Sequence, residues 1–160
     1  MQPDAADHLD AVTLGQFLAA LPRDLRVLHD AGNSSAPLRW VEPSELEDPT
    51  PYLLDGEFVL TAGLPFLDAG GTKERAEAYV RRLVGAGVAA LGFGLEPYFD
   101  DVPDHVMSAC QTHQLTLVQI PSSVPFAAIG LEFSQLLESG NARVFRQLAE
   151  RFRGFTLKIK

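Results

Sequence analysis

The sequence predicts an α/β fold with a mixed sheet, parallel at its centre, flanked by helices and followed by a C-terminal helical extension. Helical and strand patterns alternate over residues 72–120, which is the order of a right-handed crossover unit with parallel strands. Val88–Phe93 is an unbroken apolar run, as expected for a strand covered on both faces. From Phe126 onward the apolar residues are spaced 3, 4, 3 along the chain, which favours helices with one packed side.

Five segments have the composition of strands. The first two lie on either side of a turn cluster at Ala31–Ala36, so a hairpin between them is expected. The last two have the character of interior strands and are expected to be neighbouring, buried and parallel. In chain order the expected strands are Leu25–Leu28, Leu38–Val41, Phe58–Thr61, Val88–Phe93 and Leu115–Ile120.

Three helices are expected between or before these strands. Thr13 and Gln16 have the spacing of a capping box, in which each side chain accepts a hydrogen bond from the other residue's main chain. A short helix therefore opens there. Thr72 is a candidate N-cap for a second helix, which Gly85 stops, and a third helix is expected over Asp104–His113.

The C-terminal third predicts two further helices, separated at Gly140-Asn141. Each carries an apolar stripe with the spacing of a coiled-coil seam. Two arrangements fit: the stripes fold back on the α/β body, or they pair with a second chain. Their combined size favours a homodimer. The residues expected to carry oligomerisation are Phe126, Ile129, Phe133, Leu136, Phe145, Leu148 and Phe152.

Length and composition fit one folded domain. The chain has 160 residues, of which 46% are hydrophobic and 21% charged, as in globular proteins. Residues 1–12 are acidic and lack an apolar core, so we expect a flexible leader, followed by the domain at 13–137 and a helical connector at 138–160. No apolar run approaches the roughly 18 residues needed to cross a bilayer. We expect a cytoplasmic protein without a membrane partner.

The sequence shows no motif for catalysis or metal binding. No two of its histidines have a spacing typical of metal ligands; they are His8, His29, His105 and His113. Cys110 is the single cysteine and lies on the apolar side of a predicted helix, where an inert thiol is expected. Ser122-Ser123 lacks the flanking glycines of a nucleophile elbow. We therefore expect no enzyme, no cofactor and no metal.

Charge is unevenly distributed along the chain. The net charge is −8, but residues 143–160 carry +5, which leaves −13 on residues 1–142. An acidic body repels the phosphate backbone, whose attraction supplies most non-specific DNA affinity. No helix-turn-helix signature is found in the sequence. Contact with DNA is therefore expected only through a separate or missing domain of that kind.

The three expected parallel strands end in small or hydroxylated residues. Thr61 and Gly63 close the first of them, Gly92 and Gly94 close the second, and Ser122 follows the third. Open α/β sheets bind ligands at the carboxyl ends of parallel strands, so these residues are candidates for one ligand pocket. The alternative is that the glycines only allow tight turns and close packing, since neither GxGxxG nor GxxxxGK[ST] occurs.

A second group of candidates surrounds the loop after Leu38–Val41. In one interpretation Trp40 is a stacking wall for an effector, and Ser44 and Glu45 are polar contacts. In the other, Ser44 caps a turn and Glu45 is a solvated side chain. Both interpretations remain open on the sequence.

A series of short motifs gives the chain a family resemblance. Leu38–Gly63 contains Arg-Trp-Val, Ser-Glu-Leu, Asp-Pro and Gly-Glu-Phe-Val-Leu-Thr-Ala-Gly in that order. Tyr79–Leu83 with Gly85–Gly92 forms a second block, and Leu117–Pro121 with Val124–Phe126 forms a third. In order and spacing these blocks resemble the N-terminal domain of PucR-type (purine catabolism regulator) transcription factors over most of the chain.

The resemblance implies a sensory and assembly domain for a small metabolite of purine or amino-acid nitrogen metabolism. It also implies that residues 138–160 lead toward the rest of a regulator whose helix-turn-helix lies elsewhere. A second function class is a small-molecule-binding accessory domain of an enzyme. The Asp-Gly-Glu pattern at Asp55–Glu57 is similar to that of N-terminal substrate-binding domains of Mur ligases.

Overall fold

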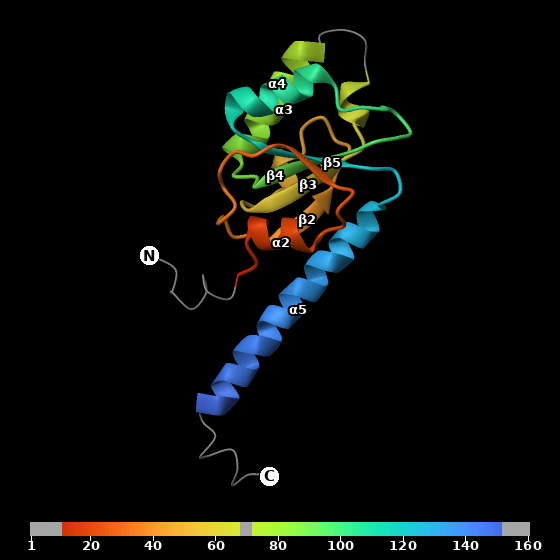
Figure 1. The fold of residues 1–160 in the computed structure, drawn as a ribbon. Coiled ribbons are helices and arrows are strands. Elements are labelled where there is room, and N and C mark those ends of the chain that lie inside the picture. Colours follow the sequence, from red (N-terminus) through yellow and green to blue (C-terminus); the bar gives the residue numbers. More distant parts are fainter. Residues whose placement is uncertain (1–10, 68–71, 152–160) are drawn as a thin grey trace.

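A five-stranded mixed sheet forms the centre of the protein (Figure 1). The computed structural model describes residues 11–67 and 72–151; for residues 141–151 it describes the course of the helix only. The strands are β1 (Arg26–His29), β2 (Trp40–Pro43), β3 (Glu57–Thr61), β4 (Ala90–Gly94) and β5 (Thr116–Ile120). The helices are α2 (Leu14–Ala20), α3 (Thr72–Gly85), α4 (Asp104–His113) and α5 (Phe126–Arg151), with short 3-10 turns η1 (Thr50–Tyr52) and η2 (Leu64–Phe66).

The strand order is β1-β5-β4-β3-β2. Strands β2, β3, β4 and β5 pair in parallel, whereas β1 pairs with β5 antiparallel. The predicted fold class, a mixed sheet with a parallel centre flanked by helices, is confirmed. The prediction that the fourth and fifth strands are neighbouring and parallel is also confirmed, with Leu91 opposite Leu117.

The predicted hairpin between the first two strands is wrong, because β1 and β2 lie at opposite edges of the sheet. The turn cluster between them makes its hydrogen bonds elsewhere. The amide Nδ2 of Asn33 donates to the Ala89 carbonyl at 2.9 Å. The hydroxyl of Thr116 donates to Asn33 Oδ1 at 2.7 Å and accepts from the Ala31 N–H at 3.1 Å. These bonds fasten the connection across the amino ends of β4 and β5, so the chain crosses the sheet instead of reversing.

Helices cover both faces of the sheet in Figure 1. Helices α3 and α4 pack on one face, and α2 with the first turns of α5 packs on the other. Strand β3 shows the alternation that this requires: Phe58 and Leu60 belong to the core beneath α2 and α5, while Val59 belongs to the core beneath α3 and α4. Burial on both faces explains why the central strands are mostly apolar.

Local sequence signals predicted the start of α2 and both ends of α4 correctly. Both hydrogen bonds of the predicted capping box are present, with the Thr13 N–H donating to Gln16 Oε1 at 2.9 Å and the Gln16 N–H donating to Thr13 Oγ1 at 3.2 Å. The helix predicted over Asp104–His113 has those bounds. The predicted leader lies outside the described residues except for its last two positions, where Val12 is buried in the core.

The predicted break at Gly140-Asn141 is wrong, because α5 continues through it as one helix. A glycine inside a helix costs about 1 kcal/mol relative to alanine, and asparagine costs less, so neither stops a helix as proline does. The helix begins against the body and its C-terminal part runs away from it (Figure 1).

The first apolar stripe of α5 packs on the chain's own body. Ile129 and Phe133 are buried, and Phe133 makes edge-to-face contacts with Phe17 and Trp40. Phe126 and Leu136 are half-buried. The side chains of Phe145 and Leu148, and all of Phe152, lie outside the described part of the structure. An oligomeric role for the second stripe stays a prediction.

We expect Val118→Asp to unfold the domain, because Val118 is fully buried in β5 and an unpaired buried charge costs about 3–5 kcal/mol. Urea unfolding followed by circular dichroism measures the loss. Ser123→Asp, which places the same charge on an exposed residue just after β5, should unfold at nearly the wild-type urea concentration. Equal stability of the two variants would show that the core does not include this face of β5.

Candidate ligand site

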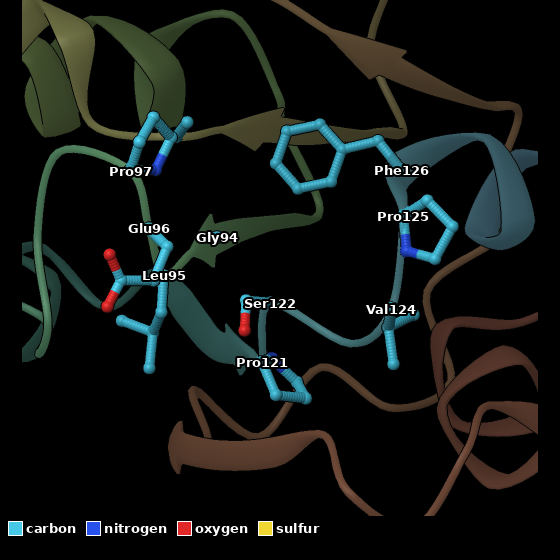
Figure 2. A pocket seen from close by; sticks show the side chains of 10 residues that line it. Gly94, Leu95, Glu96, Pro97, Pro121, Ser122, Val124, Pro125 and Phe126 are labelled. Carbon is cyan, nitrogen blue, oxygen red and sulfur yellow. The ribbon is translucent and has the colours of Figure 1, made fainter.

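A pocket of about 410 Å³ opens at the carboxyl ends of β3, β4 and β5 (Figure 2). This is the edge where loops that follow parallel strands converge, and where open α/β sheets bind ligands. Its walls are mainly apolar and rich in proline, with few polar groups. The lining residues are Ala62, Gly94, Leu95, Glu96, Pro97, Pro121, Ser122, Val124, Pro125 and Phe126.

The first residue of α5 forms one wall of this pocket. Figure 2 shows the ring of Phe126 facing the end of β4 at Gly94. A Cβ atom at Gly94 would lie 2.7 Å from two ring carbons of Phe126, which is closer than van der Waals contact allows. Glycine is therefore needed at this strand end so that α5 can start in contact with the sheet. The pocket wall therefore combines the end of the sheet with the start of α5.

The polar rim of the pocket comes from the loop after β4. Glu96 has a φ of 61°, an uncommon left-handed conformation for a non-glycine residue, and its N–H donates to the Phe99 carbonyl at 2.8 Å. A hydrogen bond with Asp100, and the repulsion between the two carboxylates, raise the pKa of Glu96 above its ordinary value. The rim is therefore acidic and exposed.

Glu45 fastens the loop that follows β3. Its carboxylate accepts hydrogen bonds from Thr61 Oγ1 at 2.7 Å, from the Ala62 N–H at 2.7 Å and from the Leu64 N–H at 3.2 Å. The expectation that Glu45 is solvated is therefore wrong. Because its oxygens are engaged by protein donors, Glu45 positions Ala62 in the pocket wall.

The other residues predicted around Glu45 have separate roles. The hydroxyl of Ser44 accepts from the Leu46 N–H at 3.3 Å, which is the turn-capping alternative. Trp40 pairs with Glu57 at the amino end of β3, so it lies at the opposite end of the strands from the pocket. Trp40 is 49% exposed and its ring contacts Phe133 of α5, so the structure does not bring it to the other ligand-site candidates.

Two of the predicted glycines serve packing. A Cβ atom on Gly92 would lie 2.7–2.9 Å from side-chain atoms of Leu60, Ile120 and Phe58, so Gly92 lets the core close over β4. Gly63 has a φ of 92° and would meet the rings of Phe93 and Phe99. For Gly92 and Gly63 the structure therefore agrees with the alternative in which the glycines allow tight turns and close packing.

Among the predicted residues, Gly94 and Ser122 line the pocket, and buried Thr61 supports its wall through Glu45. Sequence reasoning missed the rest of the lining. The signal that would have found it is the proline that follows each of two strand ends, at Pro97 and Pro121, because rigid loops there keep a hollow open. The apolar spacing that begins at Phe126 predicts an oligomer seam and gives no sign of the pocket.

The described residues offer little for catalysis or metal binding. Within them, no group of three or more histidine, cysteine or acidic side chains is arranged to hold a metal ion. Burial raises the pKa of Cys110 to about 12, which leaves an unreactive thiol, as predicted. No helix in the described part of the chain is long and apolar enough to span a membrane.

Comparison with known proteins gave one family and one solved structure. Residues 17–137 match the model of the purine catabolism regulatory protein-like family, PucR. No curated protein matched. The crystal structure of the CBS and DRTGG domains of the regulatory region of Clostridium perfringens pyrophosphatase, complexed with the activator diadenosine tetraphosphate, is similar with a TM-score of 0.49 and 12% identity. The match covers 88% of this chain and 52% of the pyrophosphatase chain, so this chain spans about half the length of that structure.

We expect Glu45→Ala to lower the free energy of unfolding by about 2–3 kcal/mol, because hydrogen bonds to a charged group contribute about 1.5–3 kcal/mol and three donors lose their acceptor. Urea unfolding measures the change. Glu47→Ala in the same loop is the matched control. Glu47 is exposed and makes a surface ion pair with Arg75, which contributes at most about 1 kcal/mol. If both variants lost the same stability, the hydrogen bonds accepted by Glu45 would not be what holds the loop after β3 in place.

Proposed function

Because the chain belongs to the purine catabolism regulatory protein-like (PucR) family, we propose that it is the effector-sensing and assembly domain of a transcriptional regulator. Membership in a regulator family gives the chain a regulatory role. The finer parts of the proposal are that a small molecule binds the pocket at the strand ends, that the domain is a homodimer, and that it acts in the cytoplasm.

The observation that carries the proposal is the shared wall of the pocket. Phe126 begins α5 and also closes the pocket against Gly94. An effector that contacts Phe126 stabilises one position of α5 relative to the sheet, and a ligand shifts an equilibrium by its difference in affinity for the two states. In the proposed mechanism, occupancy of the pocket is transmitted along α5.

The pocket's chemistry supports a particular kind of effector. Its volume of about 410 Å³ is in the range of small-molecule sites, and its walls are apolar. Glu96 supplies an acceptor and Ser122 a hydroxyl at the rim. We infer a flat, uncharged or cationic ligand with N–H donors, of which a purine base or a related nitrogen metabolite is an example.

The domain is proposed to bind without catalysis and to reach DNA through another domain. The pocket lining contains one carboxylate and one serine hydroxyl, with no imidazole, thiol or amine to act as a base toward that hydroxyl. The −13 charge on residues 1–142 opposes contact with DNA phosphates. A helix-turn-helix elsewhere in the regulator would read the operator.

A thermal-shift screen of purine and nitrogen metabolites should find a ligand that raises the melting temperature. Binding at a concentration of 100 times Kd stabilises the folded state by about 2.7 kcal/mol. Ser122→Trp should abolish the shift, because Ser122 lines the pocket and is exposed, so that an indole there fills the hollow without entering the core.

The matched control is Ser123→Trp, which adds the same side chain to the next exposed residue, outside the lining. It should keep the wild-type response. A ligand that stabilises both tryptophan variants equally binds elsewhere and would contradict the proposed pocket.

Light scattering should show a dimer at protein concentrations of tens of micromolar. This requires a dimer dissociation constant on the order of a micromolar or tighter. Leu148→Asp should shift it toward monomer, since it places a charge in the second apolar stripe. Leu131→Asp is the control, because Leu131 is 60% exposed on α5 and outside both stripes. A wild-type monomer would contradict the proposed assembly.

A further inference from the structure

Exposed apolar side chains are concentrated on the loops at the carboxyl ends of the parallel strands. Ten large apolar side chains are exposed among the described residues, and four of them lie on these loops. We call these four the apolar edge: Leu46 after β2, Leu64 and Leu67 after β3, and Tyr98 after β4, each 42–50% exposed. Single exposed apolar residues are normal, whereas a group of them with a polar rim marks an interaction surface.

The loops that carry the apolar edge lie side by side. The Glu45 carboxylate, in the loop after β2, accepts hydrogen bonds from the Ala62 and Leu64 N–H groups, so this loop adjoins the loop after β3. A Cβ atom on Gly63 would lie 2.7 Å from the ring of Phe99, so the loop after β3 adjoins the loop after β4. The four side chains therefore belong to one end of the molecule.

The rim of the apolar edge is acidic. Residues 44–56, 62–71 and 95–103 contain no lysine or arginine. Glu96, Asp100 and Asp101 are exposed, and no ion pair among the described residues joins them to a base. The hydrogen bond with Asp100 and the repulsion between the two carboxylates, which together raise the pKa of Glu96, show how close these acids lie. A cation beside them relieves the repulsion, so the rim suits a basic partner.

The chain itself contains a segment of complementary composition. Residues 143–160, which we call the distal segment, carry a net charge of +5. The same segment contains the second apolar stripe, with Phe145, Leu148 and Phe152. Its apolar residues match the apolar edge and its arginines match the acidic rim, as in interfaces whose apolar centre has a charged border of complementary sign.

The course of α5 keeps the distal segment away from the apolar edge of its own chain. Helix α5 begins at the strand ends, where Phe126 lines the pocket, and runs away from the body as one helix to Arg151 (Figure 1). Phe145 lies nineteen residues beyond Phe126, which is about 28 Å along the helix axis. The distal segment that meets an apolar edge therefore comes from another chain. In a two-fold dimer each chain gives one segment and receives one, so the contact forms twice.

We propose that the apolar edge of one chain binds the distal segment of a second copy. The proposal rests on the homodimer of the proposed function and adds to it the surface that receives the segment. Ala62, Glu96 and Pro97 line the pocket and belong to the loops of the apolar edge. The docked segment lies beside the pocket, so an effector bound there acts on the contact between the chains as well as on α5.

Photocrosslinking of the full chain tests where the distal segment lies in the dimer. A photoreactive phenylalanine analogue replaces Phe145, and a mixture of isotope-labelled and unlabelled chains distinguishes crosslinks between chains from those within one. Crosslinks between chains to residues 62–67 or 95–101 are expected. Crosslinks that leave these loops out, such as ones joining the two distal segments, would overturn the proposal while keeping the homodimer. A chain that is monomeric in light scattering would overturn both.

Leu64→Asp should raise the dimer dissociation constant about tenfold or more, because it places a charge in the apolar centre of the contact. Leu64 is exposed, so the variant should keep its fold, which circular dichroism checks. The matched control is Leu54→Asp, at a 62% exposed residue before the amino end of β3. Analytical ultracentrifugation should give this control the wild-type dissociation constant. Equal weakening by both variants, or by neither, would contradict the proposed contact.

The acidic rim has its own pair of variants. Asp101→Asn should raise the dimer dissociation constant about threefold, the effect of losing one exposed charge pair. Asp55→Asn makes the same charge change before the amino end of β3, where Asp55 pairs with Arg39, and should leave the dissociation constant unchanged. If Asp55→Asn weakened the dimer as much as Asp101→Asn, net charge rather than the acidic rim would be responsible, and the proposed contact would be wrong.

Discussion

The need to cover three parallel strands on both faces determines the rest of the structure. Strands β3, β4 and β5 are buried throughout except at Gln119, so each face requires its own layer of helices. Helices α3 and α4 supply one layer, but the short helix α2 is too small to supply the other alone. The first turns of α5 complete it, with Ile129 and Phe133 in the core. Because α5 begins beside the strand ends, its first residue, Phe126, becomes a wall of the pocket there.

The loop after β2 connects this core to the pocket at the strand ends. Glu45 turns inward and holds the end of β3, where Ala62 lines this pocket. Glu47, two residues later, turns outward and pairs with Arg75 of α3. The Glu45 carboxylate is held by three donors, whereas the Glu47 carboxylate makes an exposed ion pair, so displacing the Glu47 side chain costs less than displacing that of Glu45.

Periodicity and capping were enough to predict the strands, the three shorter helices and the parallel centre, because those features depend on local composition. The position of β1 was not predictable in this way, since it depends on where Asn33 and Thr116 find hydrogen-bond partners across the fold. The roles of Gly92 and Gly94 differ for a similar reason. Both belong to β4, and only their three-dimensional neighbours show that Gly92 lets the core close whereas Gly94 makes room for Phe126.

The continuity of α5 gives the proposed sensing mechanism its reach. With 26 residues, the helix extends about 39 Å at 1.5 Å per residue. If two separate helices were joined at Gly140-Asn141, a movement of Phe126 would not be transmitted to the second helix, because each helix could reorient on its own. In a single helix the main-chain hydrogen bonds continue through that point, so a rotation at the pocket turns the distal segment with it. The two apolar stripes in the sequence therefore belong to one continuous helix, and the first of them fastens that helix to the sheet.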